Sequence, residues 1–202
     1  IIHVGCVDHI PLIDKKIKDN TYLHKRLNEV AFKQFGIDNS REGVEYMQQK
    51  LKYDNVAYED ILEGEIHETI TSDKWDAMIM GEILEHIDNP VHFLRCIHDR
   101  YKQYVNELVI TVPNALSISN TLNSFKNIER VNSDHRYWFT PYTLNKILHL
   151  AGFIPLYHEF ATYYPVNHKG VKAVRNVLVK YLLTRNPAFR SDLVMVAAFG
   201  NK

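Results

Sequence analysis

The chain has 202 residues with 24 basic and 24 acidic side chains, so its formal net charge is zero, and 46% of the residues are hydrophobic. This length indicates one domain with a sizeable core. The balanced charge argues against a general nucleic-acid-binding protein. The two cysteines, Cys6 and Cys96, are too far apart in the sequence to suggest a disulfide framework, which favours a reducing, cytoplasmic setting.

Short apolar runs alternate with amphipathic stretches along the chain. Strands are predicted near 1–4, 35–37, 56–58, 76–80, 107–112, 154–160 and 193–199, and helices over 22–34, 41–51, 90–103, 140–151 and 170–184. The helix at 140–151 has the clearest limits, because Thr140 can cap it, Pro141 suits its first position and Gly152 suits its end. Strands separated by helices predict a doubly wound α/β fold, with a mostly parallel sheet and helices on both faces. We expect a single domain over 1–202, with an excursion over about 161–191 before the last strand.

Residues suited to a nucleotide ligand follow the predicted strands, and in such a sheet ligands bind at the carboxyl ends of the strands. Gly5 and Cys6 follow the first strand, and both are small enough for a ligand to approach the backbone closely. Asp38 follows the second strand and offers two carboxylate oxygens to the hydroxyls of a ribose. Asn39 with Glu42 also resembles the capping box of the next helix, so the two interpretations of this corner coexist.

The third, fourth and fifth strands are followed by polar residues as well. Asp60 follows the third strand and either accepts a hydrogen bond from an adenine amino group or is a surface acid in an acidic loop. Gly81 and Glu82 follow the fourth strand. Asn114 begins a long polar loop after the fifth.

Two longer segments carry a family resemblance. Residues 75–90, WDAMIMGEILEHIDNP, resemble the segment WDxIxxxEVLEHxxxP of class I S-adenosylmethionine-dependent methyltransferases. Residues 135–153, which begin HRYWFTPYTL and end AGF, resemble the later segment H…FT…L…AGF of the type 11-like members. The resemblance runs from residue 1 to about 160 and resumes in the final strand. It implies a Rossmann-like sheet of seven strands, the last one antiparallel and inserted beside the fifth.

The resemblance also implies a role for each matching position, with S-adenosylmethionine as cofactor and S-adenosylhomocysteine as product. The methionine part would lie against Gly5 and Cys6, the ribose against Asp38 and Asn39, the adenine against Asp60 and Ile61, and the sulfonium against Gly81 and Glu82.

The first motif departs from the family pattern acid-x-Gly-x-Gly-x-Gly. His3 stands at the position of the acid, and Val7 and His9 stand at the second and third glycines. A neutral histidine can hydrogen-bond a cofactor amine but cannot offer it a negative charge. The stretch between this motif and Asp38 is also longer than usual, and we expect this insert to rebuild part of the cofactor wall.

Methyl transfer depends mainly on positioning, and it needs a base only when the acceptor must lose a proton. His135 is the first candidate for that base, with a structural histidine as the alternative, and Glu82 and His86 are weaker candidates. His86, His92 and His98 are spaced by six residues and cannot share one helix face. No Cys-x-x-Cys or His-Glu-x-x-His motif occurs, so we expect no metal site.

The excursion before the last strand is basic and contains no acid. Apolar residues at helical spacing predict an amphipathic helix there, and the basic residues are Lys169, Lys172, Arg175, Lys180, Arg185 and Arg190. One interpretation is a helix packed on the sheet with a solvated basic face. The other is contact with an anionic acceptor, such as a phosphate-bearing or lipid-linked glycan at a membrane surface.

The sequence therefore predicts a methyltransferase that acts on an oxygen or nitrogen atom of a small molecule or glycan, in the cytoplasm or peripherally at a membrane. Two alternatives remain. One is a methyltransferase-like domain without activity that serves in binding or assembly, because the first motif is altered. The other is an NAD-dependent oxidoreductase, whose three-glycine fingerprint is missing here.

Overall fold

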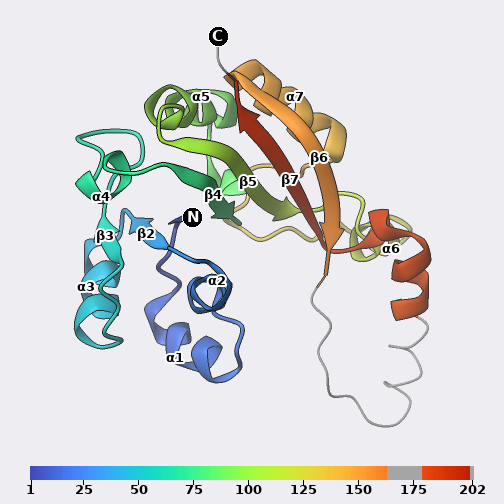
Figure 1. Cartoon of the computed structure of the whole chain (residues 1–202). Helices are drawn as coiled ribbons and strands as arrows, with labels where there is room; N and C mark the ends of the chain where they lie inside the picture. Colours follow the sequence, from blue (N-terminus) through green and yellow to red (C-terminus); the bar gives the residue numbers. More distant parts are fainter. Residues whose placement is uncertain (163–178, 201–202) are drawn as a thin grey trace.

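The computed structural model describes residues 1–162 and 179–200, and a seven-stranded sheet forms its centre (Figure 1). The strand order is β3-β2-β1-β4-β5-β7-β6. The strands are β1 (Ile2–Val4), β2 (Phe35–Asp38), β3 (Val56–Tyr58), β4 (Trp75–Gly81), β5 (Val105–Pro113), β6 (Phe153–Ala161) and β7 (Asp192–Phe199). β7 pairs antiparallel with both β5 and β6, whereas the pairs among β1 to β5 are parallel. The predicted seven-stranded sheet, with its last strand antiparallel beside the fifth, is confirmed.

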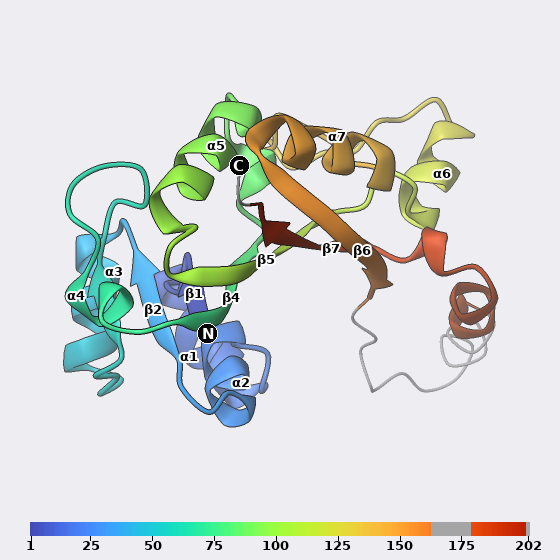
Figure 2. The same ribbon diagram turned by 45° about the horizontal axis from the view of Figure 1, so that its top comes forward.

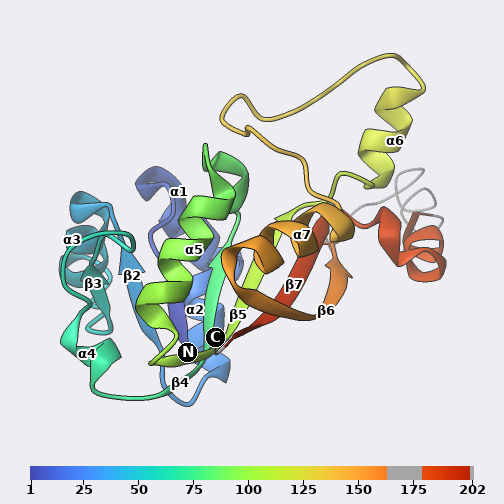
Figure 3. The ribbon, with the colours of Figure 1, turned by 90° about the horizontal axis from the view of Figure 1, so that it is seen from above.

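Helices cover both faces of the sheet. α5 and α7 lie side by side on one face, and α1 and α2 lie on the other (Figures 1 and 2). Figure 3 shows α3 at one end of the sheet and α6 beyond the other end. The helices are α1 (Ile10–Lys18), α2 (Leu23–Val30), α3 (Arg41–Gln49), α4 (Glu68–Thr71), α5 (Pro90–Tyr101), α6 (Ile118–Ser124) and α7 (Pro141–Ala151), with short 3-10 helices η1 (Leu84–His86) and η2 (Pro187–Phe189).

Two apolar clusters hold these layers together. The larger one lies between the sheet and the face of α5 and α7, where Met78 and Leu108 of the central strands are fully buried with Leu94 and Leu148. The smaller one includes Ile13 of α1 and joins the N-terminal helices to α3 and the first strands. Burial of such side chains contributes about 1.5–3 kcal/mol each, which fixes the insert before β2 against the sheet.

Helix ends follow local chemistry, with one correction. The limits predicted for α7 are confirmed, because the Thr140 side chain accepts from the Thr143 amide at 3.2 Å and Gly152 ends the helix with φ +104°. At α3 the predicted cap was wrong. Ser40, and not Asn39, caps the helix, and its hydroxyl accepts from the amide of Gly43 at 3.2 Å.

The insert between β1 and β2 holds two helices where the sequence predicted one. The helix expected over 22–34 is shorter, ending at Val30, and α1 was missed. Pro11 lies in the first turn of α1, where proline is well tolerated because its missing N–H needs no partner.

Most of the basic helix predicted over 170–184 lies outside the described residues. Residues 179–185 are helical. Arg190 is not part of a solvated basic face, because its guanidinium donates to the carbonyls of Phe160 at 2.7 Å and Leu183 at 3.3 Å. Among residues 1–162 and 179–200, no helix combines the length and the hydropathy of a membrane-spanning segment.

Candidate active site

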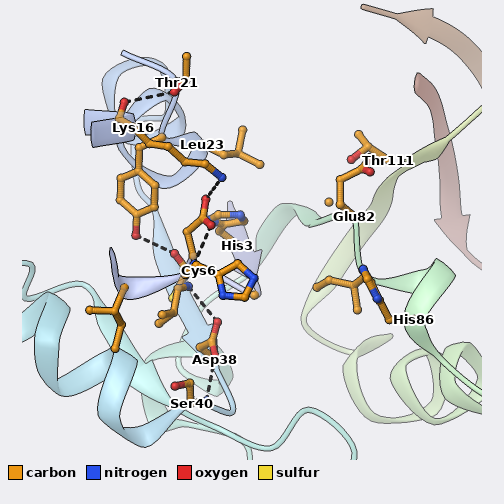
Figure 4. Close-up of a pocket in the computed structure, with 18 of the residues that line it drawn as sticks. His3, Cys6, Lys16, Thr21, Leu23, Asp38, Ser40, Glu82, His86 and Thr111 are labelled. Atoms are coloured by element: carbon orange, nitrogen blue, oxygen red, sulfur yellow. Dashed lines mark hydrogen bonds and ion pairs between the residues drawn. The ribbon is translucent and has the colours of Figure 1, made fainter. Parts of the chain in front are cut away.

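A cleft of about 970 Å³ opens at the carboxyl ends of β1, β2 and β4. The strand order reverses between β1 and β4, and this reversal is where doubly wound sheets form their ligand crevice. His3, Cys6 and Asp38 lie on one wall, and Glu82 and His86 lie on the opposite wall (Figure 4).

Most of the residues predicted for the site meet in this cleft. The predicted residues that line it are Gly5, Cys6, Asp38, Gly81, Glu82 and His135. They come from the ends of three strands and from a distant loop, so the fold brings together what the sequence separates.

Three other predicted residues are not among those that line the cleft. Asn39 is exposed, and its neighbour Ser40 lines the cleft instead. Asp60 is exposed, and its carboxylate accepts from the amide of Leu62 at 2.9 Å, while Ile61 packs against the main core. The adenine role of Asp60 and Ile61 stays a prediction.

The Asp38 carboxylate joins the two loops at the bottom of the cleft. One oxygen accepts from the amide of Val7 at 2.9 Å, and the other accepts from the amide of Ser40 at 2.8 Å. Burial raises the pKa of Asp38, and these amide donors oppose the shift. A carboxylate has about four acceptor positions. The two amides therefore do not exhaust the acceptor positions of Asp38, and a further donor such as a ribose hydroxyl can bind there.

The insert forms one wall of the cleft, as expected from its length. Tyr22 donates its hydroxyl to the carbonyl of Cys6 at 2.8 Å, and Lys16 forms an ion pair with Asp8. The insert residues that line the cleft are Ile10, Pro11, Lys16, Thr21, Tyr22 and Leu23. These contacts fix the loop after β1, which is the loop in which the family pattern has its glycines.

Val7, which replaces the second glycine of the pattern, is accommodated by another glycine. Its side chain lies against Gly43 of α3, where a Cβ would collide with it. Val7 therefore fits beside α3 because position 43 is a glycine, since a larger residue there would fill the space that the Val7 side chain occupies.

His3, at the position of the family's acid, belongs to a buried polar group behind the first loop. Its Nδ1 lies 3.1 Å from Nδ1 of His24, which in turn lies 2.8 Å from Nε2 of Gln34. His3 is 3% exposed and His24 is 0% exposed. Burial lowers the pKa of His3 to about 3, with His24 adding to the effect, and burial lowers the pKa of His24 to about 4. Both rings are therefore neutral at pH 7, and this corner carries no charge.

Glu82 and Glu85 make the opposite wall acidic. Glu82 has φ +53°, an uncommon backbone conformation for a residue other than glycine and one that recurs at functional sites. Its side chain is exposed at the cleft. Partial desolvation, followed by the like charges of Glu85 and Asp192, raises the pKa of Glu82. Glu85 is 0% exposed, and burial raises its pKa as well.

His135 reaches the same wall from the loop after α6. Its ring lies edge-on to that of His86, with centroids 4.6 Å apart, and its buried Nδ1 has no hydrogen-bond partner among the described residues. The loop is held by other groups, because the amide of Arg136 donates to the carbonyl of Glu85 at 2.8 Å and the hydroxyl of Tyr137 donates to that of Asp88 at 2.8 Å. The alternative of a histidine that ties its loop to the core is therefore not favoured.

Sequence reasoning missed Glu85 and Thr111 as residues of this cleft. A signal for Glu85 was present, since an acid three residues after Glu82 shares its side of a helical turn. Thr111 pairs with Gly81 across β4 and β5, a contact that only the sheet register reveals.

Comparison with known proteins gives one family. The family model described as "Methyltransferase domain" matches residues 19–158. No curated protein matches the chain.

Several solved structures share the fold. A S-adenosylmethionine-dependent methyltransferase from Archaeoglobus fulgidus is 19% identical with a TM-score of 0.55, and the match covers 98% of this chain and 84% of that one. The complex between the Haloferax volcanii Trm112 methyltransferase activator and the putative methyltransferase is 14% identical with a TM-score of 0.60, and the match covers 100% of this chain and 82% of that one. Magnesium protoporphyrin IX methyltransferase from Synechocystis, with S-adenosylhomocysteine bound, is 14% identical with a TM-score of 0.56, and the match covers 98% of this chain and 72% of that one.

The family match covers more than half of the chain, and the strand order, the cleft at the reversal point and the segment over 75–90 agree with it. The chain belongs to the methyltransferase-domain family and is a class I S-adenosylmethionine-dependent methyltransferase.

Proposed function

We propose that this cleft holds S-adenosylmethionine and that the methyl group passes to an oxygen or nitrogen atom of a small-molecule or glycan acceptor beside Glu82 and His135. One observation carries the proposal. Residues predicted separately from strand ends and from a distant loop line one cleft of about 970 Å³. When bound, the cofactor supplies an electrophilic methyl group on a sulfonium.

The described residues fit this cofactor. Asp38 keeps free acceptor positions for ribose hydroxyls after binding the amides of Val7 and Ser40. The acidic wall of Glu82 and Glu85 suits the positive charge of a sulfonium. His3 is neutral, so the methionine amine receives a hydrogen-bonding partner at most, without an opposite charge.

At the acceptor end, the chain contributes positioning and a proton acceptor. Nδ1 of His135 is buried without a partner, so its lone pair is available to a hydroxyl or amine that enters the cleft. We expect His135→Ala to lower turnover about 10²–10⁴-fold, the usual contribution of base catalysis, while cofactor affinity stays within a factor of about two.

Calorimetry with S-adenosylmethionine, S-adenosylhomocysteine and NAD tests the proposal directly. Binding of the two sulfur compounds, and not of NAD, is expected. Binding of NAD alone would favour the oxidoreductase alternative, and binding of none would favour a domain that serves in assembly. A survey of hydroxylated and amino-bearing small molecules and glycans with methyl-labelled cofactor then identifies the acceptor class.

The location of the protein in the cell is part of the same proposal. We infer a cytoplasmic protein that reaches an anionic acceptor through the exposed residues Lys180 and Arg185 of the basic excursion. Flotation with anionic liposomes at physiological salt tests its membrane version, which requires the protein to rise with the vesicles.

A further inference from the structure

One side-chain cluster in the acidic wall has no partner that accounts for it. Glu85 of η1 is fully buried, and no N–H or hydroxyl group of a described residue donates to its carboxylate oxygens, whose one close polar neighbour in the described chain is the carboxyl group of Glu82. Its nearest cationic candidate is Nε2 of His86 at 3.9 Å, beyond hydrogen-bond distance. A buried carboxylate without partners is costly, so its retention calls for a ligand that the side chain binds.

The rings of His86 and His135 face this carboxylate. One ligand atom from each of Glu85, His86 and His135 can be chosen so that all three lie within 4.8 Å of one another. His135 contributes a buried Nδ1 that also lacks a partner among the described residues. Two unsatisfied groups from distant parts of the chain therefore point into the same small space.

His86 is oriented as metal-binding histidines usually are. Its Nδ1 donates to the backbone carbonyl of Asp134 at 3.1 Å, which leaves the lone pair of Nε2 free on the side of Glu85. Histidines that bind metals generally donate their other ring N–H to such a carbonyl or to a carboxylate. The amide of Arg136 also donates to the carbonyl of Glu85 at 2.8 Å, so the loop and η1 are fixed to each other at this point.

We propose that Glu85, His86 and His135 bind one divalent transition-metal ion in the wall of the cleft. Two imidazoles and one carboxylate are a ligand set of Zn²⁺, Fe²⁺ and related ions, and three protein ligands leave a coordination position open. All three residues line the cleft, so the open position faces the space for the acceptor.

The ion gives the proposed function a substrate class. Resting on that function, the inference is that the acceptor is a hydroxyl compound whose oxygen would bind the metal, because a bound hydroxyl loses its proton to water at a lower pH and is held in place. Its oxygen would then bond to the methyl carbon as the carbon–sulfur bond of the cofactor breaks, and neutral S-adenosylhomocysteine would leave. His135 then acts through the ion instead of taking the proton itself. The sequence predicted no metal, because that prediction compared histidines along one helix, whereas His135 comes from a loop far along the chain.

Titration of Co²⁺ into the full chain, freed of metal with a chelator, tests the site by visible absorption. One Co²⁺ per chain with d–d bands is expected. His86→Asn is the sharpest variant, because its amide can still donate to the carbonyl of Asp134 while the ligand atom Nε2 is removed. We expect this variant to bind Co²⁺ more than about 100-fold more weakly, because loss of a residue that only hydrogen-bonds a metal ligand already costs about 10–100-fold.

His92→Asn is the matched control. His92 lies on α5 beside Cys96, with Nε2 and Sγ 3.6 Å apart, and is the histidine of another pair that could take Co²⁺. It should bind the ion as the wild type does. Glu85→Gln removes a buried charge without changing size, so it is expected to fold and to lose binding even where His86→Asn fails to fold.

The site is refuted by a wild type that takes no Co²⁺, by site variants that bind it like the wild type, or by loss of binding in His92→Asn. Calorimetry of S-adenosylhomocysteine with the metal-free wild type separates the two proposals. Cofactor binding without Co²⁺ binding overturns the metal site alone, and Co²⁺ binding without cofactor binding overturns the proposed function.

Discussion

Lowering the pH from 7 to 5 should destabilise the fold through His3 and His24. Burial lowers the pKa of these rings to about 3 and about 4, whereas a histidine in an unfolded chain titrates near 6.5. Between pH 6.5 and 4 the unfolded chain therefore binds protons that the folded chain does not, and stability falls as the pH falls. At pH 5 each ring costs about 2 kcal/mol relative to pH 7, or about 4 kcal/mol for the pair, out of a typical total of about 5–15 kcal/mol.

The double variant His3→Asn/His24→Asn isolates this contribution. Asparagine offers a polar atom near the position of Nδ1, the atom that each ring uses in the buried group, and it does not titrate. Urea unfolding at pH 5, 6 and 7, followed by circular dichroism, gives the free energy of unfolding for each protein. Between pH 7 and 5 the variant should lose about 4 kcal/mol less than the wild type.

The comparison with the wild type is essential, because other groups act in the opposite direction. Burial raises the pKa of Asp38 and of Asp192, so these carboxyls favour the folded chain as the pH falls. They are present in both proteins, and their effect cancels in the difference. His149→Asn, which removes an exposed histidine of α7, is the control and should keep the wild-type profile. Parallel profiles for the double variant and the wild type would refute the reasoning.

Three further predictions concern the walls of the cleft. Gly43→Ala should destabilise the fold by about 1–3 kcal/mol in urea unfolding, because the new Cβ meets Val7, and adding Val7→Ala should restore most of the loss. Tyr22→Phe should cost about 1–2 kcal/mol and weaken cofactor binding in calorimetry, because the carbonyl of Cys6 loses its donor; unchanged stability would show that the insert is not held by this bond. Asp38→Asn should weaken cofactor binding at least tenfold by the same method, about 1.4 kcal/mol, whereas equal affinity would exclude the carboxylate from the ribose contact.

The parts of this site that the sequence predicted are those set by the chain within a few residues. Gly5 and Glu82 directly follow strands and Asp38 is the last residue of one, and the carboxyl ends of parallel strands meet at one edge of a sheet. The confirmed limits of α7 rest on local capping chemistry in the same way. Asn39 was predicted to line the site, but Ser40 lines it instead. This error shows the limit of such reasoning, because a shift of one residue at a strand end turns a side chain to the other face.

What the sequence could not predict depends on contacts between distant segments. α1 was missed because its apolar residue Ile13 packs on α3 and the first strands, a partner that no local pattern reveals. The cluster of Glu85, His86 and His135 needs the loop after α6 to return to η1, and that return is fixed by the bond from the Arg136 amide to the Glu85 carbonyl and by side-chain bonds across a long sequence separation. The backbone bond leaves no mark on the sequence, because backbone donors and acceptors are the same in nearly every residue, and the side-chain partners are identified only once the fold is known.

The altered first loop follows from these distant contacts. The family's glycines allow the loop to stay small, and here the same space comes from Gly43, against which Val7 packs. The acid that His3 replaces would place a charge beside the buried ring of His24, and a neutral pair of rings avoids that cost. The carboxyl groups of Glu82 and Glu85 lie on the opposite wall, where burial raises the pKa of both and the like charge of Glu85 adds to the shift of Glu82. A positively charged ligand at the reacting end of the cleft therefore favours the ionised form of these two groups, whereas the methionine end offers neutral histidines and the Asp38 carboxylate.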